Sequence, residues 1–376
     1  MKNLTYFVFF IYILLSINIS YTKKLNISFL EQEKALSEEC KRIELTPNSE
    51  NVKYIGRFFV KNQATWLALS GSAIEFYLIG KSAEIVLVGD GSSIYSDKDQ
   101  RPRYGIYVND EKILDATMGE LEKTVELFNY DNEKEVKIRV ILLSEAMNGG
   151  IGIKNININS CSEKIIRPTE YKKLRIEYIG DSITCAYGVE SASPAESFKT
   201  TTENFELSYA FLSAKELDAD YSGVCFSGSG VMAQGNRMPE HYIKTNSFTF
   251  KEEWDFKKFP NDIVVINLGT NDSGYAAESK RDEYIQEYTN FLTLLREKNP
   301  NAYIFCTLGM MGGEDLFLSI EKAITLFGDK KVFSFLLPNQ KIEDGIGAQY
   351  HPNYVTHAKA AKIVAEKIRE VIEGKK

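Results

Sequence analysis

The residues best suited to chemistry begin with Ser182, in the segment Gly180-Asp181-Ser182. This segment directly follows an apolar run, 174–179, which is typical of a buried strand. In an open parallel sheet, ligands bind at the carboxyl ends of the strands. The glycine permits a tight turn there, so that backbone N–H groups can face a developing negative charge. The segment by itself also fits an ordinary Gly-Asp-Ser turn.

Two other polar loops follow strand-like runs. Asn271 lies in the loop 269–272, directly after the apolar run 263–268, and its side-chain amide can donate to an oxyanion. One such donor contributes about 3 kcal/mol to transition-state stabilisation. Gly228 lies in the loop 227–230, after a third run, and its N–H can reach the same crevice. Each loop alone fits a polar turn, but their shared position at strand ends favours one site.

A serine nucleophile needs a base, and the chain contains three histidines. His351 precedes Pro352 and a predicted final helix, 353–373, so a late loop can hold it at the rim of the sheet. His357 is expected inside that helix, and His241 lies in a polar insertion. The sequence therefore predicts His351 as the general base.

Other chemistries find no support in the residue patterns. No Gly-x-Ser-x-Gly elbow surrounds Ser182, which excludes the α/β-hydrolase signature. No His/Cys cluster has metal-ligand spacing, and no phosphate-binding glycine loop of the Walker or dinucleotide type occurs. We therefore expect no metal and no cofactor. A formal net charge of -7, without a long basic run, argues against a nucleic-acid partner.

Two regions with different patterns must position these residues. Residues 51–160 contain short alternating segments separated by Gly, Asn and Asp, as in a β-sandwich or jelly roll. The predicted strands there are 54–60, 64–70, 74–79, 83–88, 104–108, 124–128, 136–143 and 151–158. After residue 172, apolar runs alternate with amphipathic segments, the pattern of a parallel sheet covered by helices. The predicted strands are 174–179, 221–225, 263–268, 302–308 and 332–337, and the predicted helices are 205–217, 281–298, 315–327 and 353–373.

The N-terminus predicts export. Residues 1–22 contain Lys2, an apolar run at 6–17 and a polar exit, which is the pattern of a secretory signal peptide with cleavage between residues 20 and 22. An uncleaved anchor is the alternative, but the run is shorter than the ~20 residues that a membrane span needs. We expect a secreted protein without membrane association after the signal is removed.

The five cysteines leave at least one thiol unpaired. Cys40 and Cys161 flank the β-rich region and are one candidate pair. Cys185 and Cys225 follow two neighbouring predicted strands and are another, and Cys306 is the fifth. Both pairings stay open, as does the oligomeric state.

Four blocks in this order resemble the SGNH hydrolase superfamily. They are Gly180-Asp181-Ser182, Gly228, the segment 269–272 and His351-Pro352. The segment 180–190, GDSITCAYGVE, more closely resembles the nucleophile block of carbohydrate esterase family 2, and the β-rich half beginning at 56–58 is similar to that family's N-terminal jelly roll. The resemblance implies an all-β jelly-roll domain, 23–166, followed by an SGNH hydrolase domain, 167–376, with a flavodoxin-like, three-layer α/β fold.

The resemblance also implies an activity. It is the removal of acetyl groups from acetylated plant polysaccharide, such as xylan or glucomannan, with the sugar held at the rim between the domains. Ser182 would be the nucleophile and His351 the base. The backbone N–H groups of Ser182 and Gly228, with the Asn271 amide, would form the oxyanion hole.

One position departs from the superfamily pattern. Many SGNH enzymes carry an Asp three residues before the histidine, where this chain has Ala348. A carboxylate there normally fixes the imidazole tautomer. We therefore predict a Ser-His dyad in which a backbone carbonyl orients the ring. Asp344, the nearest upstream acid, is the alternative partner.

The chain has two tryptophans, and Trp254 is predicted to lie near the site because it precedes the run 263–268. There its ring could stack on a sugar; a core position is the alternative for both Trp254 and Trp66. Two competing functions stay open. One is an SGNH lipase or thioesterase, which needs an extended apolar groove. The other is a non-catalytic carbohydrate-binding protein, for which a retained nucleophile has no use.

Overall fold

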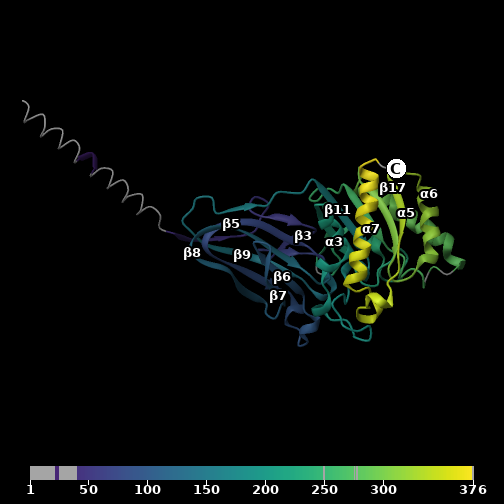
Figure 1. The fold of residues 1–376 in the computed structure, drawn as a ribbon, viewed down its shortest axis with the longest axis horizontal. Coiled ribbons are helices and arrows are strands. Elements are labelled where there is room, and N and C mark those ends of the chain that lie inside the picture. The colour runs from purple at the N-terminus through teal and green to yellow at the C-terminus, as the bar shows by residue number, and fades with distance from the viewer. Residues whose placement is uncertain (1–21, 25–39, 249, 275, 277, 375–376) are drawn as a thin grey trace, which may run out of the picture.

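The computed structural model describes residues 22–24, 40–248, 250–274, 276 and 278–374. The predicted signal peptide, apart from its last residue, lies outside the described residues. Within these ranges, no helix is long and apolar enough to cross a membrane. Two halves lie side by side along the longest axis, one built from strands and one with helices around a sheet (Figure 1).

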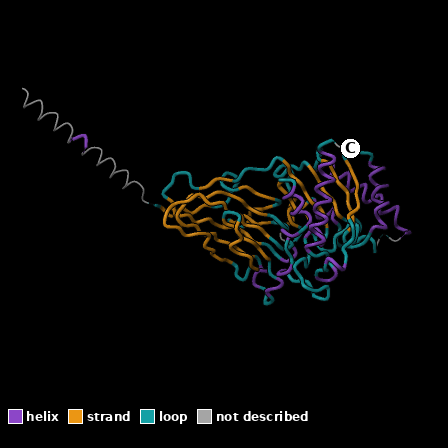
Figure 2. The backbone as a smooth tube through the Cα atoms, viewed as in Figure 1, coloured by secondary structure: helices purple, strands orange, loops and turns teal. Residues whose placement is uncertain are grey.

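The first half is an antiparallel β domain (Figure 2). Its strands are β1 (Lys41–Leu45), β2 (Lys53–Ile55), β3 (Phe58–Lys61), β4 (Ala64–Leu67), β5 (Ala73–Gly89), β6 (Arg103–Val108), β7 (Glu111–Thr117), β8 (Glu122–Leu142), β9 (Ile151–Ser160) and β10 (Ile166–Pro168). The central order is β3-β4-β9-β5-β8-β6-β7, with β1 on β9 and with β2 and β10 on β5. Strand β10 crosses the predicted domain boundary at 166/167.

Two long strands, β5 and β8, each contain two segments that were predicted as separate strands. Strand β5 contains the predicted strands 74–79 and 83–88, and β8 contains 124–128 together with most of 136–143. The ladder between β5 and β8 shifts register after Gly80, where a bulge lets both strands bend without ending. The polar residues around each bulge produce the gap in the apolar alternation, so the prediction of separate strands was wrong here.

The second half is a parallel sheet of the order β12-β11-β15-β16-β17. Its strands are β11 (Leu174–Gly180), β12 (Ala219–Cys225), β15 (Ile263–Asn267), β16 (Tyr303–Gly309) and β17 (Val332–Leu337). The long helices are α3 (Tyr209–Glu216), α5 (Arg281–Lys298), α6 (Phe317–Phe327) and α7 (Tyr354–Ile372). An insertion before β15 holds α4 (Met238–Tyr242), β13 (Lys244–Asn246) and β14 (Phe250–Glu253).

The helices cover both faces of this sheet. Ile263 and Val265 of β15 pack in the cluster that contains the buried side of α3 and α7, whereas Val264 and Ile266 pack in the cluster with α5 and α6. Successive strand residues point to opposite faces, so a strand buried on both sides is apolar at every position. This explains the continuous apolar runs and gives a three-layer α/β domain, as predicted.

The predicted helix 205–217 is divided in the structure. A short 3-10 turn, Phe205–Leu207, precedes α3, and the Ser208 hydroxyl between them accepts the Phe211 N–H at 3.0 Å. Serine at such a position caps a helix because it satisfies an N–H that has no partner within the helix. The α-helix therefore begins at Tyr209, four residues after the predicted start at residue 205.

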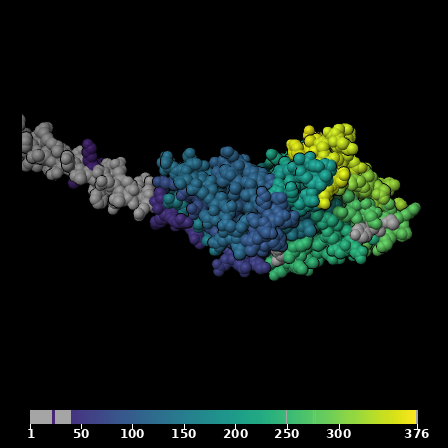
Figure 3. Space-filling view, turned by 90° about the horizontal axis from the view of Figure 1, so that it is seen from below, coloured from purple at the N-terminus to yellow at the C-terminus, as the bar shows by residue number. Residues whose placement is uncertain are grey.

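Buried charges join the two halves, which meet along a broad contact (Figure 3). Arg57 of the β half is buried, donates to the backbone carbonyls of Tyr242 and Lys244, and lies 3.3 Å from Glu177 of β11. Lys53 pairs with Asp220 at 2.5 Å. Groups of this kind are stable in a protein interior only while their partners stay in place, so the halves are closely coupled.

The cysteines resolve the pairings left open by the sequence. Cys40 and Cys161 form a disulfide that links the start of β1 to the end of β9. Cys185, Cys225 and Cys306 are buried free thiols, so the alternative Cys185–Cys225 bond is not formed.

Candidate active site

Ser182 and His351 meet at the carboxyl edge of the parallel sheet. Ser182 begins the short helix α2 (Ser182–Cys185) directly after β11, and Asp181 caps this helix by accepting the Ile183 N–H at 2.9 Å. The Ser182 Oγ lies 2.9 Å from His351 Nε2, although 169 residues separate the two in the chain. This distance is within hydrogen-bond range, so a proton can pass directly between the two atoms.

Backbone carbonyls orient the imidazole. His351 Nδ1 lies 3.1 Å from the Ala348 carbonyl oxygen and 3.2 Å from that of Gln349. Because carbonyls only accept, Nδ1 must carry the proton and Nε2 is left as the acceptor that faces Ser182. Burial lowers the pKa of His351, and the two carbonyl contacts partly oppose that shift. The ring is therefore held in its neutral, basic form.

A strained loop places these carbonyls. Gln349 and Tyr350 both have left-handed backbone angles, with φ of 47° and 61°. Such conformations are costly for residues other than glycine and persist where the surrounding structure requires them. The loop is fixed from the other side by Gly188, whose carbonyl accepts the Ala348 N–H at 3.2 Å. A Cβ on Gly188 would lie 2.4 Å from the Ala348 Cβ, so only glycine permits this approach.

The His351 ring is in contact with an aromatic side chain, whereas the nearest upstream acid is bound to a lysine. The Tyr187 ring stacks on His351 with centroids 4.2 Å apart, and its hydroxyl hydrogen-bonds to Gln349. The Asp344 carboxylate instead pairs with Lys359, at 2.6 and 2.7 Å. The acid nearest upstream is thus engaged by a cation and not by the imidazole.

Asn271 lies beside the nucleophile turn. Its Nδ2 donates to the Ser229 carbonyl at 2.9 Å and to the Asp181 carboxylate at 3.2 Å. The neighbouring Asp272 accepts the N–H groups of Val231 and Met232 and so ties this loop to the one after β12. Burial, together with the charge of Asp272, raises the pKa of Asp181 to about 7.

Gly228 occupies the loop that follows β12. Its φ of 78° is in the left-handed region that glycine favours. Asn236 holds this turn by donating its Nδ2 to the Ser227 carbonyl at 2.8 Å. The loops of Ser182, Gly228 and Asn271 therefore follow three adjacent strands, β11, β12 and β15, at one edge of the sheet.

Trp254 lies at the other edge. This residue is 5% exposed, and its indole packs against Arg57 and Phe58. The cavity that it lines also includes Asn261 and Asn301, which precede β15 and β16. Residues before a parallel strand and residues after it lie at opposite edges of the sheet, which corrects the prediction that Trp254 lies near Ser182 and stacks on substrate there.

The structure brings other residues to the site that the sequence did not single out. Tyr350 is 66% exposed beside His351, and Tyr187 covers the imidazole. Glu145 reaches Ser227 from the β half, at 2.6 and 2.8 Å. Tyr187 lies within the nucleophile block and Tyr350 next to the histidine, so proximity in sequence could have indicated both. No such signal marks Glu145.

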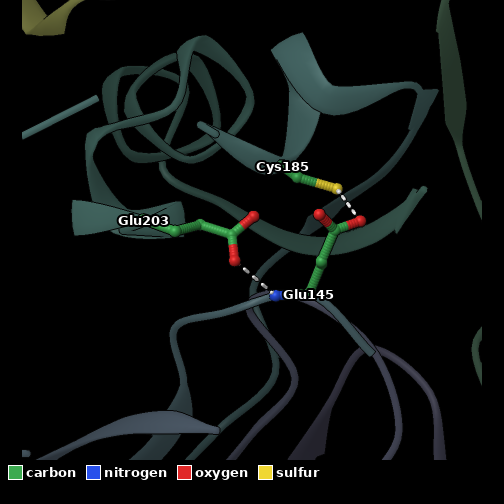
Figure 4. A group of neighbouring side chains, drawn as sticks. All are labelled: Glu145, Cys185 and Glu203. Atoms are coloured by element: carbon green, nitrogen blue, oxygen red, sulfur yellow. Dashed lines mark hydrogen bonds between the residues drawn. The ribbon is translucent and has the colours of Figure 1, made fainter. Parts of the chain in front are cut away.

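One group of described side chains has metal-ligand atoms close together. It consists of Glu145, Cys185 and Glu203, whose ligand atoms lie within 4.8 Å of one another (Figure 4). All three are buried, and hydrogen bonds from Ser227 and Cys185 engage the Glu145 carboxylate. Hydrogen bonds from the protein itself thus already engage the group.

Comparison with known proteins separates the same two halves. The model of the Carbohydrate esterase 2 N-terminal domain matches residues 54–168, and that of the GDSL-like Lipase/Acylhydrolase family matches residues 178–359. The chain joins a carbohydrate esterase 2 N-terminal domain to a GDSL-like hydrolase domain. This combination agrees with the family resemblance seen in the sequence motifs.

Individual relatives share this organisation. The chain is 29% identical to the cellulase/esterase CelE of Acetivibrio thermocellus over 88% of its own length, and it spans 40% of that relative. It is 26% identical to an acetylxylan esterase / glucomannan deacetylase of Cellvibrio japonicus, over 67% of this chain and 72% of the relative. A family two carbohydrate esterase from Clostridium thermocellum, solved with cellohexaose, matches with a TM-score of 0.77 and 27% identity, over 86% of this chain and 99% of the other. The likeness confirms the predicted fold class.

Proposed function

We propose that this chain is a secreted serine esterase that removes acetyl groups from acetylated plant polysaccharide such as xylan or glucomannan. The observation that carries the proposal is the 2.9 Å contact between His351 Nε2 and Ser182 Oγ, with Nδ1 directed at two backbone carbonyls. A donating Nδ1 leaves Nε2 as a proton acceptor, which is the state that a general base needs.

In the first half-reaction, Ser182 Oγ attacks the acetyl carbonyl carbon as His351 Nε2 takes the hydroxyl proton. The resulting oxyanion accepts hydrogen bonds from the N–H groups of Ser182 and Gly228, and from the Asn271 amide once one of its two N–H groups leaves the Ser229 carbonyl or the Asp181 carboxylate. Collapse of the tetrahedral intermediate breaks the bond to the sugar oxygen, which leaves with the proton from Nε2. The products are the free sugar hydroxyl and an acetyl-enzyme.

In the second half-reaction, water replaces the sugar. His351 Nε2 takes a proton from water as its oxygen attacks the acetyl-enzyme, and Ser182 leaves with that proton, which releases acetate. The imidazolium formed in each half-reaction is stabilised by the carbonyl oxygens of Ala348 and Gln349. These dipoles supply the orientation that a carboxylate gives in a triad, so the proposed machinery is a Ser-His dyad.

A carbohydrate substrate is supported by two kinds of observation. The chain is similar to an acetylxylan esterase / glucomannan deacetylase and to an esterase solved with cellohexaose. In this chain Tyr350, 66% exposed beside His351, offers an aromatic face on which a sugar ring can pack. It takes the place in the proposal that the sequence prediction gave to Trp254.

Secretion belongs to the same proposal. The Cys40–Cys161 disulfide is typical of proteins that fold in an oxidising compartment. The apolar run near the N-terminus has the pattern of a signal peptide. Mass spectrometry of protein from the culture medium, with a new N-terminus between residues 20 and 22, would test this part of the proposal.

The decisive experiment measures acetate release from acetylated xylan, acetylated glucomannan and a short-chain aryl ester. Ser182→Ala should lose at least about 10³-fold in kcat, because it removes the nucleophile. Ser279→Ala, at an exposed serine of the same domain, should keep full activity. Activity that survives Ser182→Ala would refute the mechanism. A preference for long acyl chains would favour the lipase or thioesterase alternative, and carbohydrate binding without any acetate release would favour the non-catalytic one.

A further inference from the structure

Glu145 is a residue of the β half that reaches into the α/β half. It follows β8 and is buried. Its Oε1 accepts the Ser227 hydroxyl at 2.6 Å, and its Oε2 accepts the Ser227 N–H at 2.8 Å. The Cys185 thiol lies 3.8 Å from the same Oε2 (Figure 4). One carboxylate therefore receives three donors from the other half of the molecule.

These donors belong to the two turns on which the proposed chemistry depends. Ser227 directly precedes Gly228, whose N–H is a proposed oxyanion donor. Cys185 is the last residue of α2, the short helix that begins with Ser182. The carboxylate thus links the nucleophile turn to the oxyanion turn. Oxyanion donors must be held in place before the reaction if they are to stabilise the transition state, because their reorganisation would otherwise cost energy.

We propose that Glu145 is a positioning residue, which fixes the turn of Ser227 and Gly228 relative to Ser182 from the β domain. The inference rests on the proposed function, since it concerns the oxyanion hole of that reaction. It gives the β domain a part in the chemistry that is separate from any binding of carbohydrate. Glu145 acts through Ser227 and touches neither substrate nor reacting atoms.

A second buried acid, Glu203, supports this arrangement. Its Oε2 accepts the Glu145 N–H at 2.9 Å, and its Oε1 has no hydrogen-bond partner among the described residues. The titratable groups around the pair include the thiols of Cys185 and Cys225, the Tyr187 hydroxyl and the Asp181 carboxylate. The Arg103 guanidinium donates to the Glu203 backbone carbonyl and to neither carboxylate of the pair. Two adjacent buried carboxyls cannot both ionise readily. Burial raises the pKa of both carboxyls, and more strongly for Glu203, which has fewer donors.

The test substitution is Glu145→Gln, which keeps the shape but replaces one acceptor oxygen by an NH2 donor. Only one of the two Ser227 donors then keeps its partner. We expect kcat and kcat/KM for an aryl acetate to fall together by about 10–100-fold, the result of weaker stabilisation of the transition state alone.

The matched control is Glu206→Gln. Glu206 also joins the halves through a buried carboxylate, at 2.5 Å from Arg139, but it contacts neither turn. The Glu206→Gln substitution should lower the melting temperature of the full chain and have little effect on kcat. If Glu145→Gln and Glu206→Gln reduced kcat equally at comparable stability, the effect would belong to the domain interface in general and the inference would be overturned.

Three outcomes keep the inference separate from folding and from the proposed function. A folded Glu145→Gln with kcat within about twofold of the wild type overturns it. If that variant does not fold, Ser227→Ala decides: loss of the hydroxyl that binds Oε1 should lower kcat by about 3–10-fold at unchanged KM, and an unchanged kcat overturns the inference. Activity in Ser182→Ala would overturn the proposed function itself, whatever the Glu145 variants do.

Discussion

The imidazole of His351 is held by two peptide carbonyls instead of a carboxylate. A carbonyl is uncharged, so it fixes the tautomer at a smaller desolvation cost than a buried acid. The left-handed angles of Gln349 and Tyr350 supply the geometry. The tautomer thus depends on the backbone of one loop, and no second ionisable group has to be kept charged beside the base.

His351→Ala and Asp344→Ala distinguish a dyad from a triad. Removal of a general base costs about 10²–10⁴ in rate, and we expect a loss in this range for His351→Ala. Asp344→Ala should retain kcat within about threefold, because that carboxylate pairs with Lys359. Steady-state kinetics on an aryl acetate measure both. Equal losses in the two variants would mean that Asp344 supports the base and that the dyad assignment is wrong.

The pH profile follows from the state of the base. Only neutral His351 accepts the serine proton, so activity falls as pH drops through its pKa. Burial lowers that pKa, so the acid limb of kcat/KM should have its midpoint below the unperturbed value of about 6.5. Stopped-flow measurements on an aryl acetate would locate it. A profile that stays flat across the acid range would exclude His351 as the base.

Asp181 requires a control in that measurement, because burial raises its pKa to about 7, within the same range. Asp181→Asn removes this second titration but keeps an oxygen that can accept the Ile183 N–H. The acid limb should persist in this variant if His351 causes it. Loss of the limb would instead assign it to Asp181.

At the scale of elements, a second histidine links two helices. His357 of α7 is fully buried, and its Nδ1 accepts the Tyr209 N–H at the start of α3 at 3.0 Å. Burial lowers the pKa of His357 to about 3. The unfolded chain takes up this proton below about pH 6.5, whereas the folded chain does so only near pH 3. The contribution of His357 to stability is thus complete above pH 6.5 and is lost as pH falls.

The free energy of unfolding should therefore decrease on acidification below about pH 6.5, with up to about 1.4 kcal/mol per pH unit from this group. His357→Gln retains an acceptor for the Tyr209 N–H and does not titrate. Denaturant unfolding of both proteins at several pH values should show a shallower slope in the variant. Parallel slopes would mean that other groups govern acid unfolding.

The elements themselves were largely predictable. The five parallel strands were recognised from their mainly apolar runs. In β15 the run is continuous because both of its faces are buried, whereas polar residues interrupt β11 and β12. The final helix was recognised because its apolar period is long. The bends of β5 and β8 were not predicted, because polar residues at a bulge resemble a turn in the sequence. The prediction for Trp254 was wrong because it used only the closeness of this residue to β15 in the sequence. Trp254 precedes β15 and Asn271 follows it, so the two residues lie at opposite ends of the strand. Glu145 was missed because 82 residues and a change of domain separate it from Ser227.

At the scale of the whole molecule, Arg57 connects the halves. Removing one partner of a buried ion pair typically costs about 3–5 kcal/mol, because the other charge is left without compensation. Arg57→Ala should destabilise the protein by this amount, as measured by denaturant unfolding, since it leaves Glu177 buried and unpaired. The double variant Arg57→Met/Glu177→Gln should be less destabilised than Arg57→Ala. If the double variant lost as much or more, the unpaired charge would not be the cause.

The Glu145–Ser227 contact also restricts how such a protein can be recombined. The fold divides near residue 168, where the first sheet ends. A chimera joined at this point would take its β domain from another protein. Glu145, which accepts from Ser227, and Arg57, which pairs with Glu177, would then be replaced by the residues of that protein at the same positions. Exchange of domains between related chains should therefore succeed only when both contacts are inherited with them. The smallest unit that can be transferred with its activity intact is the pair of domains, not the hydrolase half alone.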